Sequence, residues 1–170
     1  MPEHPAVTLV TAALRSAGAT GEVRWLDDSA RTAAEAASAL GIEVGAIANS
    51  LVFLLDGEPV LVMTSGAHRV DTAWLGEQVG GVFSRADAAT VKAATGQVIG
   101  GVAPVGHPRA IRTLVDTALE QYPRIWAAAG HAHTVFPTTY AELVRMTSGT
   151  PTPVEPQGRL RARGWHPRRP

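Results

Sequence analysis

Residues 49–64 read Asn-Ser-Leu-Val-Phe-Leu-Leu-Asp-Gly-Glu-Pro-Val-Leu-Val-Met-Thr, and this stretch decides the fold class. Two apolar runs, residues 49–55 and 59–64, flank the dipeptide Asp56-Gly57. Asp-Gly between apolar runs is typical of a tight hairpin turn, because glycine adopts positive φ without steric cost. Both runs are almost continuously apolar, which indicates that both faces are covered. The sequence therefore predicts an antiparallel hairpin that is buried on both sides.

The segments around this hairpin alternate between helix and strand patterns. Thr32 with Glu35 is typical of a capping box, and Asp71, Asp87 and Thr139 are expected N-caps of later helices. We expect helices over residues 5–17, 32–41, 71–78, 87–96, 116–121 and 139–146, and strands over 22–26, 111–115 and 124–129. This mixed order predicts an α+β (mixed α/β) domain over residues 1–148.

The composition favours one folded domain. The chain has 170 residues, of which 45% are hydrophobic and 18% charged, and it has no cysteine. The apolar fraction argues against disorder of the whole chain, and the lack of cysteine excludes disulfides, thiolate metal sites and a thiol nucleophile. No apolar run approaches the roughly 20 residues of a membrane span, and the N-terminus lacks a signal-peptide pattern. We therefore expect a cytoplasmic protein, with Trp25, Trp74 and Trp126 in its core.

The balance of 15 basic and 15 acidic side chains hides an asymmetry. Five arginines and no acidic residue follow Gln157, so the rest of the chain carries ten basic and 15 acidic side chains. After Ser148 the Pro, Gly, Thr and Arg content predicts no packed core, and residues 149–170 are expected to be a disordered tail. The tail is either a solvated end or a cationic arm for phosphate, with Trp165 as a stacking surface for a nucleobase.

Residues 95–107 form a glycine-rich segment between an expected helix and an expected strand. They read Thr-Gly-Gln-Val-Ile-Gly-Gly-Val-Ala-Pro-Val-Gly-His. No Gly-Lys-Ser/Thr follows, which excludes a P-loop, and no clear helix follows, which argues against the dinucleotide fingerprint. The segment is either a structural turn or a site where backbone N–H groups bind a carbonyl oxygen or a phosphate.

Two groups of polar side chains carry weaker signals. His131 and His133 are expected on one side of a strand, where an i, i+2 pair of histidines can bind a metal. No further ligand pattern in the sequence supports a metal site, so contact with substrate or simple exposure to solvent is favoured for this pair. Ser65, His68 and Asp71 have the residue types of a hydrolytic triad, but they lie close together in sequence without a nucleophile elbow. Asp71 is explained more simply as an N-cap.

Five short motifs follow one another along the chain: Ala46-Ile-Ala-Asn-Ser-Leu-Val-Phe53, Val62-Met-Thr-Ser-Gly66, Arg69-Val-Asp71, Ala94-Thr-Gly-Gln-Val-Ile-Gly-Gly-Val-Ala-Pro-Val-Gly106 and Ala128-Ala-Gly130. Taken in this order, they resemble the YbaK/ProX family, whose members are aminoacyl-tRNA deacylases and prolyl-tRNA-synthetase-associated domains. No single motif is specific, but the ordered set is, and it spans about residues 20–147.

The resemblance implies a mixed, partly closed β-sheet with flanking helices and a trans-editing activity, the hydrolysis of the ester that links a wrong amino acid to the 3′ end of tRNA. It implies no metal or organic cofactor, the tRNA 3′ end as partner with weak contact to a synthetase, and no DNA or membrane partner. The attack would depend on backbone groups and the ribose hydroxyl of the substrate. The implied catalytic loop is Gly100, Gly101, Val102, Ala103 and Pro104, and the expected substrate-binding residues are Asn49, Ser50, Ser65, Gly66, Arg69, Gly106, His107, Gly130, His131 and His133.

One position departs from the family. Editing members carry a lysine where this chain has Asn49, and Lys92 is the only lysine in the sequence. A charge-assisted hydrogen bond stabilises by roughly 1.5–3 kcal/mol against about 1 for a neutral one, so the change is expected to weaken binding or rate about tenfold. Either Arg69 or an arginine of the tail compensates, or Asn49 is only the first residue of a strand.

Three functions remain open from the sequence. The first is a trans-acting deacylase for a small mischarged amino acid such as Ala, Ser, Cys or Pro. The second is a module that binds the aminoacyl-adenosine end without turnover, which the neutral Asn49 favours. The third is a small-ester hydrolase on the same scaffold. Dependence on tRNA separates the first from the third.

Overall fold

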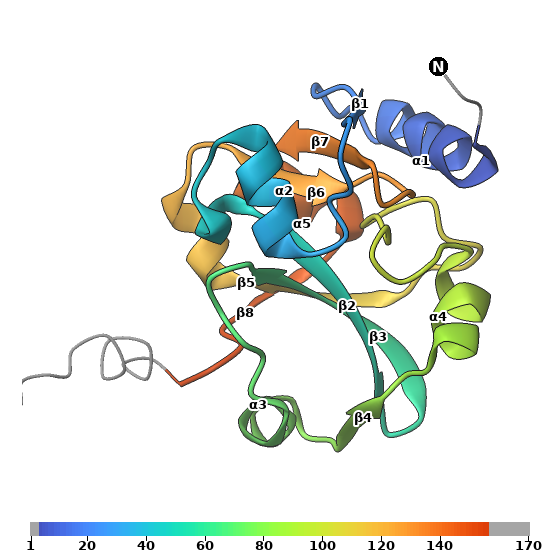
Figure 1. Cartoon of the computed structure of the whole chain (residues 1–170). Helices are drawn as coiled ribbons and strands as arrows, with labels where there is room; N and C mark the ends of the chain where they lie inside the picture. The colour runs from blue at the N-terminus through green and yellow to red at the C-terminus, as the bar shows by residue number, and fades with distance from the viewer. Residues whose placement is uncertain (1–3, 157–170) are drawn as a thin grey trace, which may run out of the picture.

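Two β-sheets form the centre of the protein, and the computed structural model describes residues 4–156 (Figure 1). The larger sheet has the order β4 (Phe83–Arg85), β2 (Ala48–Leu55), β3 (Glu58–Ser65), β5 (Arg112–Asp116) and β8 (Thr150–Thr152). The smaller sheet has the order β1 (Arg24–Trp25), β7 (Thr134–Thr138) and β6 (Ile125–Ala128). Because β3 pairs antiparallel with β2 and parallel with β5, the larger sheet is mixed, and the predicted mixed α/β class is confirmed.

The hairpin predicted from residues 49–64 joins β2 and β3. Its turn residues Asp56 and Gly57 both have positive φ, 50° and 86°, as a type I′ turn requires. The register runs from Leu55 opposite Glu58 to Ala48 opposite Ser65. Every residue of β3 from 60 to 65 is buried, as expected for a strand covered on both faces. The expectation was wrong for β2, whose residues 49–54 are only half-buried, because its outer edge is not covered by another strand along most of its length.

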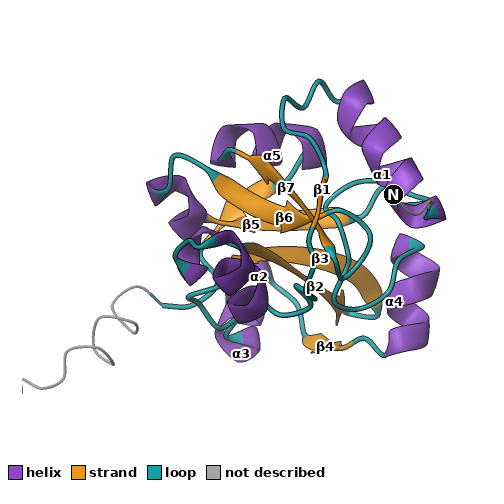
Figure 2. Ribbon diagram, turned by 45° about the horizontal axis from the view of Figure 1, so that its top comes forward, coloured by secondary structure: helices purple, strands orange, loops and turns teal. Residues whose placement is uncertain are grey.

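Side chains from both sheets meet in one core. Leu61 and Met63 of β3 pack with Ile125 and Ala127 of β6 and with Phe136 of β7, and all five are nearly fully buried. The opposite face of the larger sheet packs on α3 (Thr72–Val79), and the outer side of the smaller sheet on α2 (Ala33–Leu40). The sheets therefore stack face to face, with helices around them (Figure 2).

The helices begin at the capping residues that the sequence predicts. The side chains of Thr32, Asp71, Asp87 and Thr139 each accept a hydrogen bond from the backbone N–H three residues later. The remaining helices are α1 (Pro5–Ser16), α4 (Ala88–Thr95), α5 (Tyr140–Thr147) and the short 3-10 turns η1 (Val44–Ala46) and η2 (Thr117–Gln121). No helix within residues 4–156 has the length and apolarity that crossing a membrane requires.

The folded part extends beyond the expected boundary at residue 148. Strand β8 pairs parallel with β5, and Val154 and Glu155 are buried at 0% and 5% exposure. The boundary was wrong because composition does not reveal that the edge of β5 offers this short segment a hydrogen-bonding partner. The five arginines after Gln157 and Trp165 lie outside the described residues.

Candidate functional site

A cavity of about 310 Å³ lies where the start of α2, the start of β2, the glycine-rich loop and β6 converge. Most of its lining is apolar, with small side chains from the α2 region and Trp126 from β6. The lining residues that matter below are Ala30, Arg31, Ala33, Ala36, Asn49, Ser50, Gly100, Val102 and Trp126. An apolar hollow with a few converging polar groups is the usual form of a small-molecule site.

One wall of the cavity is a free edge of strand β2. Among the described residues, this edge is paired only at its two ends: Ile47, just before β2, forms a bridge with Trp126 of β6, and β4 pairs with β2 from Phe53 onward. In a two-residue hairpin the residues beside the turn, here Leu55 and Glu58, form a hydrogen-bonded pair. Hydrogen-bonded and non-hydrogen-bonded pairs then alternate along β2, so Ser50 is in a non-hydrogen-bonded pair and its N–H and C=O point away from β3. The Ser50 hydroxyl donates to Met63 Sδ at 3.2 Å. The backbone of Ser50 is therefore available to a ligand.

The opposite wall is the glycine-rich loop, whose backbone amides divide into two groups. The N–H of Gly101 donates to the carbonyl of Val98 at 3.0 Å, and the N–H of Ala103 donates to Gln97 Oε1 at 2.6 Å. Within residues 4–156, no hydrogen bond takes the N–H of Gly100 or Val102, and both residues line the cavity. Two such donors are the arrangement that stabilises the oxyanion of acyl transfer.

The buried side chain of Gln97 holds the loop in this conformation. Gln97 is 2% exposed, and its amide group bridges the loop by accepting from Ala103 N–H and donating from Nε2 to the Val105 carbonyl at 3.2 Å. The N–H of Gln97 donates in turn to the hydroxyl of Thr95, at the end of α4. The loop is thus tied to the core from inside.

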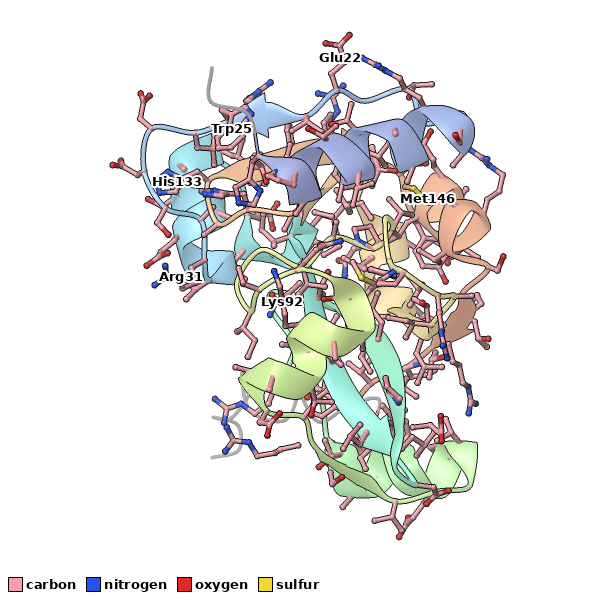
Figure 3. The ribbon with its side chains drawn as sticks, turned by 90° about the vertical axis from the view of Figure 1, so that its right-hand side faces the viewer. Glu22, Trp25, Arg31, Lys92, His133 and Met146 are labelled. Carbon is pink, nitrogen blue, oxygen red and sulfur yellow. The ribbon has the colours of Figure 1, made fainter. Side chains whose placement is uncertain are left out.

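Arg31 is the charged residue in the cavity wall, and no carboxylate of the described chain lines it. Its aliphatic stem lies against Gly100, where a Cβ atom would come within 2.4 Å of Arg31 Cγ. Its backbone N–H lies within hydrogen-bond distance of Glu35 Oε1 and Ser29 Oγ, at 3.1 and 3.3 Å. The segment before α2 is therefore fixed, and it adds an arginine to the cavity lining. Figure 3 shows Arg31 beside the start of α2.

The profile of the aminoacyl-tRNA editing domain matches residues 27–146, most of the described chain. The chain belongs to this family. A crystal structure described as a "putative trans-editing enzyme for prolyl tRNA synthetase" is 36% identical, with a TM-score of 0.85 over 91% of this chain and 99% of that one. A scaffold protein from a study of epitope grafting by computational design is 37% identical, with a TM-score of 0.84 over 91% of this chain and 99% of that chain.

A curated relative is also similar. The uncharacterized protein YwhH of Bacillus subtilis (strain 168) is 27% identical over 123 residues, which is 72% of this chain and 78% of YwhH. The family resemblance read from the ordered motifs is therefore confirmed, and so is the mixed α/β fold with flanking helices. The expected partly closed sheet is instead two separate sheets that do not close.

In this editing domain the cavity brings together part of the predicted site. Asn49 and Ser50 line it from one side, and Gly100 and Val102 from the other. Gly101 lies behind them, where an added Cβ would come within 2.9 Å of the backbone of His131, so this glycine allows close backbone packing.

The other predicted binding residues lie outside the cavity lining. Ser65 is buried, and its hydroxyl donates to the Gly45 carbonyl at 2.8 Å, while Gly66 donates its N–H to Ile47. Arg69 is exposed and absent from the lining, so the cation at the cavity is Arg31. Gly106 and His107 line a separate hollow beside α1, and Gly130 packs against α1.

The two histidines expected on a strand lie instead in the turn between β6 and β7. This turn forms because the Thr134 hydroxyl bonds to both the N–H and the carbonyl of His131. The backbone N–H of His133 donates to His131 Nδ1, and the His131 ring lies 5.1 Å from that of Trp25. Burial, followed by the nearby His4 and His133, lowers the pKa of His131. Neither histidine lines the cavity.

The residues of the possible triad have structural partners. Asp71 caps α3 by accepting from Trp74 N–H at 3.0 Å, as the sequence predicts. His68 Nδ1 lies 2.9 Å from the fully buried Asp116, which also accepts the N–H of Ser65. Since the Ser65 hydroxyl donates to a carbonyl rather than contacting His68, this group is a buried polar junction.

Sequence reasoning missed Arg31, Gln97 and the contribution of Trp126. Arg31 is an arginine before an ordinary capped helix, and Gln97 is a polar residue in a loop, so neither stands out locally. Trp126 was expected in the core; it is 6% exposed and also forms part of the cavity wall. The one available signal was the repeated alanine at residues 30, 33 and 36, which leaves space beside the helix.

Proposed function

We propose that this editing domain is a trans-acting deacylase that hydrolyses the ester between a small mischarged amino acid, of the Ala, Ser, Cys or Pro type, and the 3′ end of tRNA. The observation that carries the proposal is the cavity whose lining brings Gly100 and Val102, with their unused N–H groups, together with the free edge of β2. Family membership supplies the class of substrate.

The reaction follows from this arrangement of donors. Water adds to the acyl carbon, and the carbonyl oxygen becomes an oxyanion that accepts hydrogen bonds from Gly100 and Val102. Two preorganised donors stabilise this charge, each by about 3–4 kcal/mol in comparable sites. The ester C–O bond then breaks, the ribose oxygen takes up a proton, and a free amino acid leaves. The chain supplies no side-chain nucleophile in this scheme; the substrate's own ribose hydroxyl orders the attacking water.

Arg31 supplies positive charge where Asn49 supplies none. Both residues line the cavity, and the stem of Arg31 lies against Gly100 of the loop, so we place its guanidinium group within reach of a ligand bound to the loop amides. A charged donor stabilises an anionic or strongly polar group by roughly 1.5–3 kcal/mol. We therefore assign to Arg31 the contact with a phosphate or with the terminal ribose that a lysine makes elsewhere in the family.

The cavity lining supports a small, uncharged side chain on the amino acid. Ala33 and Ala36 of α2 and Trp126 bound an apolar space, and no described carboxylate is available there to pair with a basic side chain. Because the substrate is the product of an aminoacyl-tRNA synthetase, the proposal includes a cytoplasmic location and transient contact with such an enzyme.

A second candidate is a module that binds the aminoacyl end without hydrolysis, which the neutral Asn49 favours. The two functions are separated by measuring release of the amino acid from mischarged tRNA and cleavage of a small acyl ester by the same preparation. Hydrolysis that saturates with tRNA and leaves the small ester intact supports the deacylase. Saturable binding of mischarged tRNA without release supports the binding module, and cleavage of both esters without dependence on tRNA supports a general esterase.

A further inference from the structure

A second hollow of about 180 Å³ continues from the proposed acyl site along the free edge of β2. Five residues line both hollows: Ser50, Leu51, Ile99, Gly100 and Val102. The second hollow ends where β4 begins to pair with β2, at Phe53 opposite Arg85. The two hollows therefore form one groove, with the unpaired edge of β2 as its floor.

The chemistry of the second hollow differs from that of the first. Arg85 is the charged residue in its lining, and the other contributions are apolar, from Leu51, Phe53, Val91 and Ile99 among others. Ile99 is 57% exposed and its neighbour Val98 is 53% exposed, so the tip of the loop presents an apolar surface to solvent. The nearby carboxylate of Asp87 is occupied in capping α4, and no ion pair within residues 4–156 involves Arg85. The hollow thus offers an unneutralised cation beside an exposed apolar surface.

These features match a nucleotide. A ribonucleotide has an anionic phosphate, which suits a guanidinium group, and a planar base, which packs on exposed apolar side chains. A peptide strand added to the edge of β2 fits less well, because only residues 48–52 of that edge are unpaired between the contacts at Ile47 and Phe53.

We infer that the second hollow binds the nucleotide that precedes the terminal adenosine, with Arg85 on the phosphate that joins the two and the base against Ile99. The inference rests on the proposed function, which places the acyl group and the terminal nucleoside in the first hollow. In this proposal β4, through Arg85, and the glycine-rich loop, through Ile99, recognise the RNA chain, while the first hollow recognises the amino acid.

The test compares two stable analogues in which an amide replaces the ester, alanyl-aminoadenosine and the same compound extended by a 5′ cytidylate. We expect the wild-type protein to bind the extended analogue about tenfold more tightly, because one charge-assisted contact is added. Arg85→Gln removes this gain and leaves the affinity for the nucleoside analogue unchanged. Arg112→Gln, which removes an exposed charge on β5, keeps the gain.

The outcomes separate the inference from the function on which it rests. Binding of the nucleoside analogue with no gain from the cytidylate overturns the subsite and leaves the proposed function standing. An equal loss of affinity for both analogues in Arg85→Gln, with an unchanged melting temperature, also overturns the subsite, because Arg85 then acts in the first hollow. Failure of both analogues to bind overturns the subsite together with the proposed function.

Discussion

Replacing Gln97 by methionine is expected to destabilise the protein and disable the loop at once. Methionine has a similar length but no hydrogen-bonding amide. The substitution therefore leaves the Ala103 N–H and the Val105 carbonyl without the partners that they have at 2.6 and 3.2 Å. An unsatisfied buried polar group costs about 1–3 kcal/mol, so the loss at the buried Ala103 N–H lowers the free energy of unfolding by about that amount, and the half-buried Val105 carbonyl adds a smaller loss.

The assay is urea unfolding, with deacylation measured under conditions where the variant remains folded. We expect kcat to fall at least about tenfold, because the Val102 amide is adjacent to the released Ala103 and loses its fixed direction. Gln78→Met, at an exposed position of α3, is the matched control and is expected to change little. A loss of less than about 1 kcal/mol together with an unchanged kcat would refute the role assigned to Gln97.

A second substitution at Gln97 tests the direction of its amide. In Gln97→Glu the introduced carboxyl group accepts from Ala103 but brings its other oxygen against the Val105 carbonyl, so the protonated form is favoured in the folded state. Its folded pKa is then higher than its unfolded one. The stability that this group contributes is present below about pH 4.3 and is lost as the pH rises through the folded pKa. A variant whose stability falls on acidification relative to wild type would contradict the assigned orientation.

Two further predictions concern the same loop. Gly100→Ala is expected to abolish most activity and also to lower stability, because a φ of +94° is strained for alanine and the new Cβ meets the stem of Arg31. In Gly101→Ala the new Cβ comes within 2.9 Å of the backbone of His131, which cannot turn aside, so this variant should also lose stability; urea unfolding and deacylation rates of both variants check these losses. Burial lowers the pKa of His107, and its hydrogen bond to the Ala103 carbonyl opposes this only in part. As the pH falls, His107 therefore takes up a proton more readily in the unfolded chain than in the folded protein. The free energy of unfolding should therefore decrease as the pH falls below about 6.5, and His107→Gln should flatten that decrease in a pH series of urea titrations.

Local signals predicted most of the framework. The Asp56-Gly57 turn and the capping residues Thr32, Asp71, Asp87 and Thr139 each act within a few residues of sequence, and the structure has a turn or a helix start at every one. Strand β8 could not be read in this way, because its central residue Pro151 argues against a strand and is tolerated only because the segment is an edge strand beside β5.

The site shows the same limit. The glycines at 100 and 101 marked the loop, but the sequence does not reveal which amides remain free, since that depends on the Gln97 side chain and on the contact between Gly101 and Gly130. Arg31 reaches the cavity only because α2 packs near the start of β2, a long-range contact without a sequence pattern. The features of the site that depend on long-range packing, the free amides and Arg31, could not be predicted from the sequence, whereas the glycine-rich loop, which is a local motif, was predicted.

The most direct test of the central claim is the rate of amino-acid release from tRNA mischarged with Ala, Ser, Cys or Pro, in wild type, Arg31→Gln and the double variant Arg31→Gln, Asn49→Lys. The account predicts turnover by wild type and a loss of about tenfold or more in Arg31→Gln, since a charged contact is removed. It predicts recovery in the double variant, because a lysine at position 49 returns a positive charge to the same cavity. The account would be contradicted if the wild-type protein released none of the four amino acids faster than the corresponding ester hydrolyses spontaneously.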